Sequence, residues 1–480
     1  MPAYDAVFRD ALIFDGTGAA PRRASLAITG DRIAAVGSIS PHEGKEVVEA
    51  GHLALAPGFI DAHTHDDRIV LDAPEMLPKI SQGVTTVVTG NCGISLAPAV
   101  FQGDPPPPMN LLGGAEAYAF RDFAAYAAAL RAAAPAVNVA ALIGHSALRL
   151  ATMADIRRKA DEDEVSRMKS MAAEAMANGA AGFSTGLFYP TNAAADRAEV
   201  AAIARCFAAA GGVYATHMRD EFAGVLDSIE ESLATSADAG IPLVISHHKC
   251  AGPANWGRTA ETLPRLEDAA RRQPVNLDVY PYAAGSTNLR QDLVTPDYPI
   301  RISWSKPHPE MTGRMLGDIA AEWSCSLHEA AARLDPAGAI YFQMHEDDVR
   351  RVMCSPIAMI GSDGLPHDAH PHPRLWGTFP RVLGHYARDL ALFSMEEAIH
   401  KMTGLPARVF GLKGRGSLKP GNYADLVLFD PEAVIDRATY DSPRLMAGGI
   451  SRVYVNGALT FREGAGVAQR AGRLTGGNNF

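Results

Sequence analysis

Short β-rich runs alternate with helical patterns through the middle of the chain. The runs read LALAPGFIDAHTH, GVTTVVTGN, VNVAALIGHS, AAGFSTGLFY, GGVYATHMRD, IPLVISHHK, VNLDVYPYAAGS and IAMIGSDG. Helical segments separate most of them, and several of these end near a glycine, a common signal at helix C-termini. Eight strands that alternate with helices in this way predict an α/β fold, a (β/α)8 TIM barrel of parallel strands. A doubly wound open sheet is the alternative.

The two ends of the chain differ from the middle. YDAVFRDALIFDG and ASLAITGDRIAAVG near the start, and NYADLVLFDPEAV and SRVYVNGALTFREG near the end, are typical of hairpin strands. We expect them to form one small β-domain from 1–54 and 415–480, beside a catalytic barrel over 55–414. About seventy residues separate AAGS from IAMIGSDG, too many for a loop, so we expect an inserted, lid-like subdomain over 287–346, between strands seven and eight.

Composition and charge indicate which partners and which compartment suit the chain. The chain has 480 residues, 47% of them hydrophobic, and a net charge of −10 with both signs mixed along its length. This argues against a nucleic-acid surface. The five cysteines are odd in number and form no CxxC, so a reducing compartment fits. With no signal peptide or apolar run long enough to span a membrane, we expect a cytoplasmic protein, a monomer or small homo-oligomer without nucleic-acid or membrane partners.

Polar side chains follow the predicted strands at their carboxyl ends, where barrel enzymes place their sites. Strand one ends FIDAHTHDD, so Asp61, His63 and His65 should share one face of the chain. Two histidines at i and i+2 can bind one metal, although an isolated HxH is a weak signal. Strand two ends at Cys92, which taken alone is more often a packed residue than a ligand. Strand five ends at His217.

Strands six and eight complete the set. In VISHHK, His247 and Lys249 share a face and His248 points the other way, so one histidine can enter the barrel mouth. Strand eight offers Asp363, whose SDG context is also a good turn. Imidazole, thiolate and carboxylate donors without a CxxC cage fit a catalytic Zn2+ with an open position. Water bound to zinc is the expected nucleophile, and Asp363 is our candidate for the general base and acid.

Longer motifs resemble the amidohydrolase superfamily and, within it, the N-acyl-D-amino-acid deacylases, or D-aminoacylases. PGFIDAHTH and GSLKPGNYADLVLFD carry the wider likeness, and ISQGVTTVVTGNCGISLAP, YATHMRDE, VISHHK and IGSDGLPHD the narrower one. The likeness covers nearly the whole chain. Many two-metal members of the superfamily use a carbamylated lysine at the end of strand four, but here that strand ends STGLFYP.

The resemblance implies specific roles for these residues. Cys92, His217 and His247 would hold one zinc firmly, and a second, weaker position would be formed by His63, His65 and Asp363. The implied reaction is hydrolysis of an N-acyl-D-amino acid, a small molecule, to a carboxylate and a free D-amino acid. The preference for D over L substrates rests on the resemblance alone. The residues assigned to substrate binding are Lys249, Tyr280, Ser286 and Arg374.

Four further side chains are candidates for a pocket that receives an apolar amino-acid side chain, or for ordinary core packing: Phe188, Tyr189, Tyr341 and Met344. His145, at the end of strand three, is interpreted as a hydrogen-bond donor behind the ligands. The histidines after Asp363 are expected to face solvent; they are His367, His370 and His372.

Two other functions remain open from the sequence. One is another amidohydrolase, hydantoinase-like, which acts on cyclic or linear amides; the lysine-free strand four argues against it. The other is a catalytically silent barrel scaffold, although such proteins typically lose ligands and every expected ligand is present here.

Overall fold

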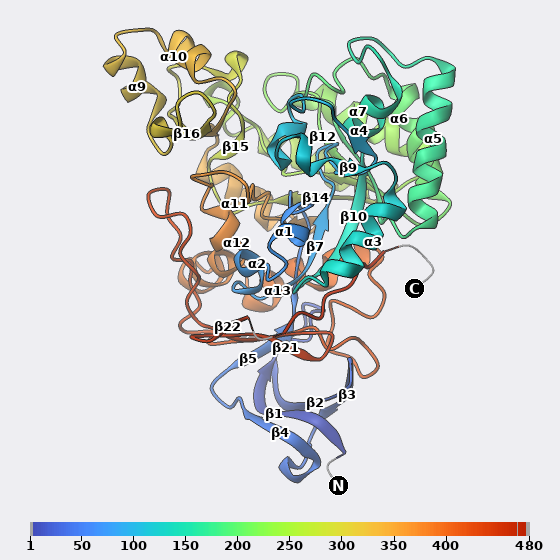
Figure 1. The fold of residues 1–480 in the computed structure, drawn as a ribbon. Helices are drawn as coiled ribbons and strands as arrows, with labels where there is room; N and C mark the ends of the chain where they lie inside the picture. The colour runs from blue at the N-terminus through green and yellow to red at the C-terminus, as the bar shows by residue number, and fades with distance from the viewer. Residues whose placement is uncertain (1–2, 468, 477–480) are drawn as a thin grey trace.

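A computed structural model describes residues 3–467 and 469–476 of the chain. Its central feature is a sheet of parallel strands in sequence order around a barrel (Figure 1). The strands are β6 (Phe59–Asp61), β7 (Val84–Thr89), β10 (Asn138–Gly144), β11 (Gly182–Gly186), β12 (Val213–His217), β13 (Leu243–Ile245), β14 (Val275–Val279) and β18 (Ala358–Ile360). Hydrogen bonds from Ala62 N to Ile360 O and from Asp363 N to His63 O, 3.2 and 2.8 Å long, join the first strand to the last. The predicted parallel barrel is confirmed.

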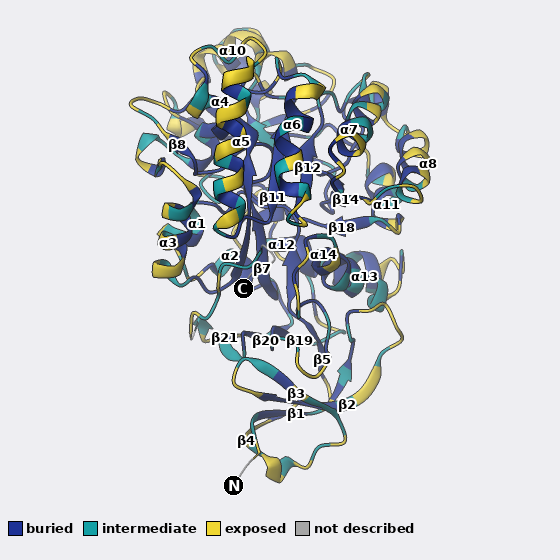
Figure 2. Cartoon of the chain, turned by 90° about the vertical axis from the view of Figure 1, so that its right-hand side faces the viewer, coloured by how far each residue is buried: buried dark blue, intermediate teal, exposed yellow. Residues whose placement is uncertain are grey.

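Helices cover the outside of the barrel. They include α3 (Phe123–Ala133), α5 (Glu162–Ala177), α6 (Arg197–Ala208), α7 (Val225–Ala239), α8 (Thr259–Ala270), α11 (Glu346–Cys354), α12 (Arg374–Arg381) and α13 (Met395–Met402). Side chains alternate across a strand, so those of successive strand residues pack into two different cores. Val87 packs outward against the helices, whereas Val88 packs into the barrel interior. Figure 2 shows the outer helices with buried inner faces and exposed outer faces.

A second sheet gathers both ends of the chain below the barrel, where the N-terminal and C-terminal colours meet in Figure 1. Its strands are β1 (Tyr4–Ile13), β2 (Arg22–Thr29), β3 (Arg32–Gly37), β4 (Gly44–Glu49), β5 (Ala54–Pro57), β19 (Leu426–Phe429), β20 (Ile450–Val455), β21 (Ala458–Arg462) and β22 (Gly466–Val467). β5 pairs with both β1 and β19, so it links the two halves. The boundaries of the domains stay a prediction.

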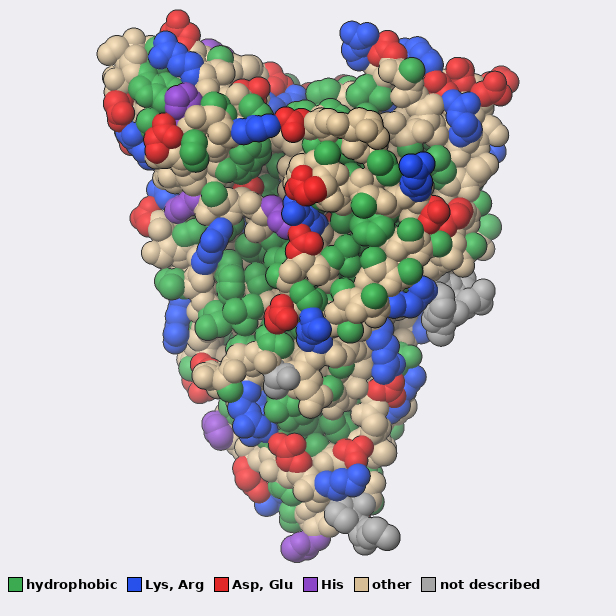
Figure 3. Space-filling model, in the orientation of Figure 1, with side chains coloured by type: hydrophobic (Ala, Val, Ile, Leu, Met, Phe, Trp, Pro, Cys, Tyr) green, Lys and Arg blue, Asp and Glu red, His purple; other side chains and the backbone are tan. Residues whose placement is uncertain are grey.

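A small subdomain interrupts the barrel between β14 and β18. Its sheet, β15 (Gly285–Asn288), β17 (Ala337–Tyr341) and β16 (Ile300–Ser305), packs with α9 (Leu316–Glu322) and α10 (Leu327–Leu334) around their own apolar cluster. Phe188 and Phe222 of the barrel pack against that cluster. Figure 3 shows a dip in the surface between this subdomain and the barrel helices, with both signs of charge interspersed over the face drawn. Among the described helices none is long and apolar enough to cross a membrane.

Candidate metal centre

The predicted donors meet in one buried cluster at the carboxyl ends of the barrel strands. Cys92 Sγ lies 3.3 Å from His63 Nε2 and 3.3 Å from His247 Nε2. Asp363 Oδ1 lies 3.2 Å from His65 Nε2 and 3.5 Å from His63 Nε2. Three overlapping groups of donor atoms result: His63 with Cys92 and His247, His63 with His65 and Asp363, and His217 with Glu221 and His247.

His217 is near the cluster without being bonded into it. Its ring centroid is 4.4 Å from that of His247. Neither ring nitrogen of this buried side chain makes a hydrogen bond within the described part of the chain. Buried polar atoms without partners are rare and call for a ligand. His65 Nδ1 is unbonded in the same way.

The charges of the cluster fit a bound cation. Burial alone would raise the pKa of the Cys92 thiol, but the His63 and His247 rings hold that pKa well below its ordinary value. Burial lowers the pKa of His65, yet Asp363 and Cys92 outweigh this and raise it to about 9. The pKa of His63 is raised as well, chiefly by Asp278 and Cys92, so protons on His63 and His65 supply positive charge between the anions of the metal-free chain. A divalent cation supplies the same charge, and thiolate, imidazole and carboxylate are zinc donors.

Two carboxylates that the sequence interpretation missed orient these donors. Asp278, in β14, lies 3.2 Å from His63 Nδ1 and accepts a 2.8 Å hydrogen bond from His247 N. Glu221 lies 3.1 Å from His247 Nδ1 and 3.4 Å from His217 Nε2. Such contacts fix the orientation of a ligating histidine. The signals were present: a charged residue inside the buried run VNLDV, and a glutamate four residues after His217.

The predicted substrate-binding residues lie beside the cluster. Arg374 is fully buried, its Nη1 is 2.9 Å from Asp363 Oδ2, and its guanidinium lies 4.5 Å from the Tyr280 ring centroid. Its Nη2 donates a 3.2 Å hydrogen bond to Ser286 O, whereas Nε and Nη1 make none within the described residues. Lys249 Nζ lies 2.7 and 2.9 Å from the two Glu221 oxygens, so its charge is already paired.

A cavity joins the cluster to the inserted subdomain. Its lining includes Cys92, His217 and Asp363 together with Phe188, Tyr189, Leu293 and Tyr341. The lining also includes the predicted residues His65, His247, Lys249, Tyr280 and Ser286. Met344 is not among these residues; it accepts a 3.8 Å hydrogen bond from Tyr280 OH and lines a neighbouring cavity instead.

Three expectations about other residues differ from the structure. Asp61 does not face the histidines; its Oδ2 lies 2.8 Å from Lys79 Nζ, because β6 ends at Asp61 and the strand alternation stops there. His145 hydrogen-bonds to Glu199 rather than to a donor of the cluster, since it begins helix α4 (His145–Thr152). His372 is buried, not solvent-facing, and is within 3.0 Å of Ala284 O.

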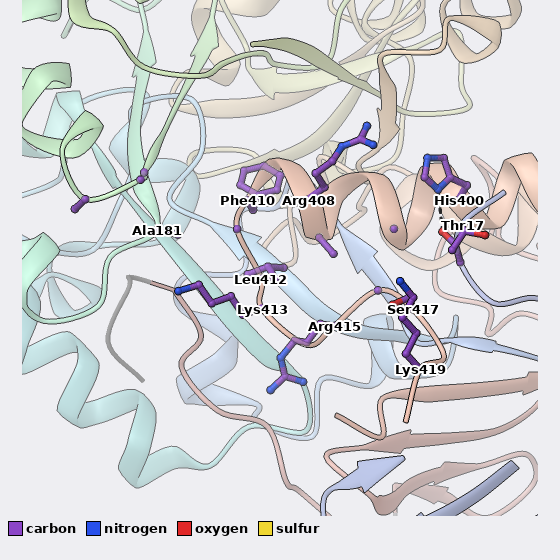
Figure 4. Close-up of a pocket in the computed structure, with 18 of the residues that line it drawn as sticks. Thr17, Ala181, His400, Arg408, Phe410, Leu412, Lys413, Arg415, Ser417 and Lys419 are labelled. Carbon is purple, nitrogen blue, oxygen red and sulfur yellow. Dashed lines mark hydrogen bonds between the residues drawn. The ribbon is translucent and has the colours of Figure 1, made fainter. Parts of the chain in front are cut away.

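Another cavity, of about 540 Å³, lies at the opposite ends of the barrel strands (Figure 4). Arg408, Lys413 and Lys419 line it, and in Figure 4 they extend in different directions from α14 (Gly404–Val409) and the loop that follows it. None of the three donor groups found in the described chain lies here. The chemistry-bearing residues therefore favour the other end of the barrel.

Comparisons with known proteins identify the family of the chain. A model of the amidohydrolase family matches residues 46–289 and 312–461. Over 471 residues the chain is 52% identical to D-aminoacylase of Alcaligenes xylosoxydans xylosoxydans, covering 98% of this chain and 97% of that protein.

Two solved structures are also similar. The first is a D-aminoacylase structure that addresses the functional role of its binuclear metal centre, with activation by one metal and attenuation by the second. Its TM-score is 0.96 at 51% identity, covering 98% of this chain and 99% of that one. The second is N-acyl-D-glutamate deacylase of Bordetella bronchiseptica, complexed with zinc and a phosphonate inhibitor that mimics the tetrahedral intermediate. Its TM-score is 0.95 at 47% identity, covering 98% of this chain and 99% of that one.

Proposed function

The chain belongs to the amidohydrolase family and, within it, to the N-acyl-D-amino-acid deacylases, and on that premise we propose that it is a zinc-dependent hydrolase of N-acyl-D-amino acids. The products are a carboxylate and a free D-amino acid. One observation carries the proposal: Arg374, a buried cation whose Nε makes no hydrogen bond within the described residues, forms an ion pair with Asp363 of the donor cluster. A cation for the substrate carboxylate thus lies beside a carboxylate that can move a proton.

Cys92, His217 and His247 would hold the firmly bound zinc, and His63, His65 and Asp363 would form a second, weaker position. Zinc, when bound, polarises the acyl carbonyl and lowers the pKa of water to about 7. Related structures with zinc or a binuclear centre support a metal centre in this family; the division of the ligands into two positions follows from the resemblance.

Asp363 is the proposed general base and acid. Burial would raise the pKa of its carboxyl, but Arg374 and His63 hold that pKa well below its ordinary value, so the group is ionised. Its Oδ1 faces the two histidines and its Oδ2 faces Arg374. From there it takes the proton of the attacking water and returns it to the nitrogen of the departing amine.

The substrate carboxylate would bind along the Nε edge of Arg374, because Nε makes no hydrogen bond within the described residues whereas Nη1 is paired with Asp363. Tyr280 and Ser286 would offer their hydroxyl groups to the substrate as hydrogen-bond donors. Lys249 would bind with less strength than a free lysine, because Glu221 competes for its ammonium.

The substrate side chain would occupy the apolar wall formed by Phe188, Leu293 and Tyr341. This wall favours apolar side chains, because Arg290, the cation that lies 4.0 Å from the Phe188 ring centroid, is already paired with Asp292. Met344 would shape the site through its contact with Tyr280.

A paired assay tests the proposal. The zinc-loaded chain is offered N-acetyl-D-leucine, N-acetyl-L-leucine, N-acetyl-D-glutamate and a hydantoin. The released amine is quantified for the three N-acetyl amino acids, and the ring-opened N-carbamoyl amino acid is quantified for the hydantoin. We expect the highest kcat/KM for N-acetyl-D-leucine. Turnover of the hydantoin alone would assign the chain to cyclic amides, and bound zinc without turnover of any substrate would leave the scaffold alternative.

A further inference from the structure

Lys79 is an unusual residue for its position. It lies in the short helix α2 (Leu77–Ile80) and its side chain is fully buried, although lysine is among the residues least often buried without a partner. It does not line the cavity beside the metal cluster. Neither its sequence context nor the proposed chemistry gives it a role.

The ammonium of Lys79 makes three contacts with buried acceptors. Nζ donates to Asp61 Oδ2 at 2.8 Å and to Ser362 Oγ at 2.6 Å, and it lies 3.3 Å from Asp66 Oδ2. Asp61 and Ser362 accept hydrogen bonds from the ammonium, and Asp66 adds an ion pair. Burial would lower the pKa of Lys79, but Asp61 and Asp66 raise it overall, so the ammonium stays charged.

These three acceptors are chain neighbours of the second donor group. Asp61 comes two residues before His63, Asp66 directly follows His65, and Ser362 directly precedes Asp363. One ammonium is therefore attached to both segments that carry those donors, the end of β6 and the end of β18.

A direct bond between the two segments strengthens the link. Ser362 N donates a 2.7 Å hydrogen bond to Asp61 Oδ1, the oxygen that Lys79 does not use. Ser362 Oγ also accepts from Gly364 N at 3.3 Å, on the far side of Asp363. The conformation of Asp363, with a left-handed φ of 49°, is thus held on both sides.

We propose that Lys79 is a positioning residue that sets the geometry of His63, His65 and Asp363. The inference rests on the proposed function for the roles of those three residues. Without the ammonium, Asp61 Oδ2 and Ser362 Oγ would lose the donor that they share and Asp66 would lose its ion pair, so the link between the ends of β6 and β18 would loosen. The second metal position and the alignment of Asp363 would both be lost, whereas Cys92 and His217 have no bond to Lys79.

The test uses Lys79→Met and the milder Ser362→Ala, which removes one acceptor. Zinc uptake is measured by titrating chelated protein, and kcat and KM are measured for N-acetyl-D-leucine at one zinc per chain. We expect the second zinc to bind at least tenfold more weakly and kcat to fall at least tenfold in Lys79→Met, with KM within twofold. Ser362→Ala should lower the affinity for the second zinc and kcat in the same direction, by a smaller factor.

Lys401→Met is the matched control. Lys401 is 1% exposed and donates to Ser355 O at 2.5 Å, so it is a buried lysine outside the cluster. Its loss should lower the melting temperature and leave the second-zinc affinity and kcat unchanged. If Lys79→Met fails to fold, Ser362→Ala decides.

Two outcomes would overturn the inference. In the first, Ser362→Ala keeps wild-type zinc affinity and kcat, and Lys79→Met folds and behaves like Lys401→Met. In the second, the wild-type chain binds a single zinc only. Zinc titration needs no substrate. A wild-type chain that binds two zinc ions but hydrolyses nothing would therefore refute the proposed function, while the effect of Lys79 on the second zinc would still be measured.

Discussion

Replacing Arg374 by lysine separates the binding of the substrate carboxylate from the support of Asp363. Lysine keeps the positive charge but has no planar fork, so one ammonium cannot both pair with Asp363 as Nη1 does and offer the substrate the donor that Nε supplies. A hydrogen bond to a charged group contributes about 1.5–3 kcal/mol, which corresponds to roughly 10- to 150-fold in a rate constant. The preference for N-acetyl-D-leucine over N-acetyl-D-leucinamide should fall by that factor.

Both substrates should also share a common loss in kcat, because Arg374 Nη1 lies 2.9 Å from Asp363 Oδ2. The assay is kcat/KM for the acid and for the amide, measured in parallel on zinc-loaded protein. Arg381→Lys is the control: Arg381 also lies in α12, but it pairs with Asp436 at 3.2 Å. Equal losses for acid and amide in Arg374→Lys would remove the carboxylate role and leave Arg374 as a partner of Asp363 alone.

Three other substitutions test the metal centre and the proton transfer. Cys92→Ala should lose firmly bound zinc and activity together, as read by metal analysis, whereas Cys250→Ala, which removes another buried thiol, should keep both. Asp363→Asn should lower kcat by at least about 10³ while one zinc stays bound; substantial remaining activity would exclude it as the general base. Glu221→Gln should weaken zinc binding about 10- to 100-fold, because it leaves His217 and His247 without their carboxylate. Glu231→Gln, which alters the pair with Arg219, should leave zinc binding unchanged.

The barrel could be predicted because β-rich runs and helical patterns alternate regularly along the chain. The alternation rule also predicted that two adjacent histidines would point apart. His247 joins the donor cluster and His248 lies 2.8 Å from Thr262 Oγ1, although β13 ends at Ile245 and the left-handed turn at His247 rather than a continuing strand separates them. The same rule misplaced Asp61, because alternation applies only as far as the strand continues and β6 is short.

The supporting residues could not be predicted from spacing in the sequence. Asp278 reaches His63 across 215 positions, and Ser362 reaches Lys79 across 283. Such contacts arise only when the barrel closes and brings the ends of β6, β14 and β18 together. A sequence pattern can indicate which strand ends carry ligands, but the partners that orient those ligands depend on which strands become neighbours. The cytoplasmic location stays a prediction.

Backbone conformation explains why the sequence around Cys92 is compatible both with a packed residue near a turn and with a metal ligand. Cys92, His247 and Asp363 have left-handed φ values of 55°, 35° and 49°, each costing about 1–2 kcal/mol for a residue with a Cβ. Gly90 and Gly93, with φ of 76° and 75°, take such conformations without that cost. The stretch GNCG is therefore a turn and a ligand carrier at once: its glycines allow the sharp bend, and the bend aims the Cys92 thiolate back at His63 and His247. Because bonds such as His247 N to Asp278 and Asp363 N to His63 O come from neighbouring strands, it is barrel closure that holds these strained residues in place.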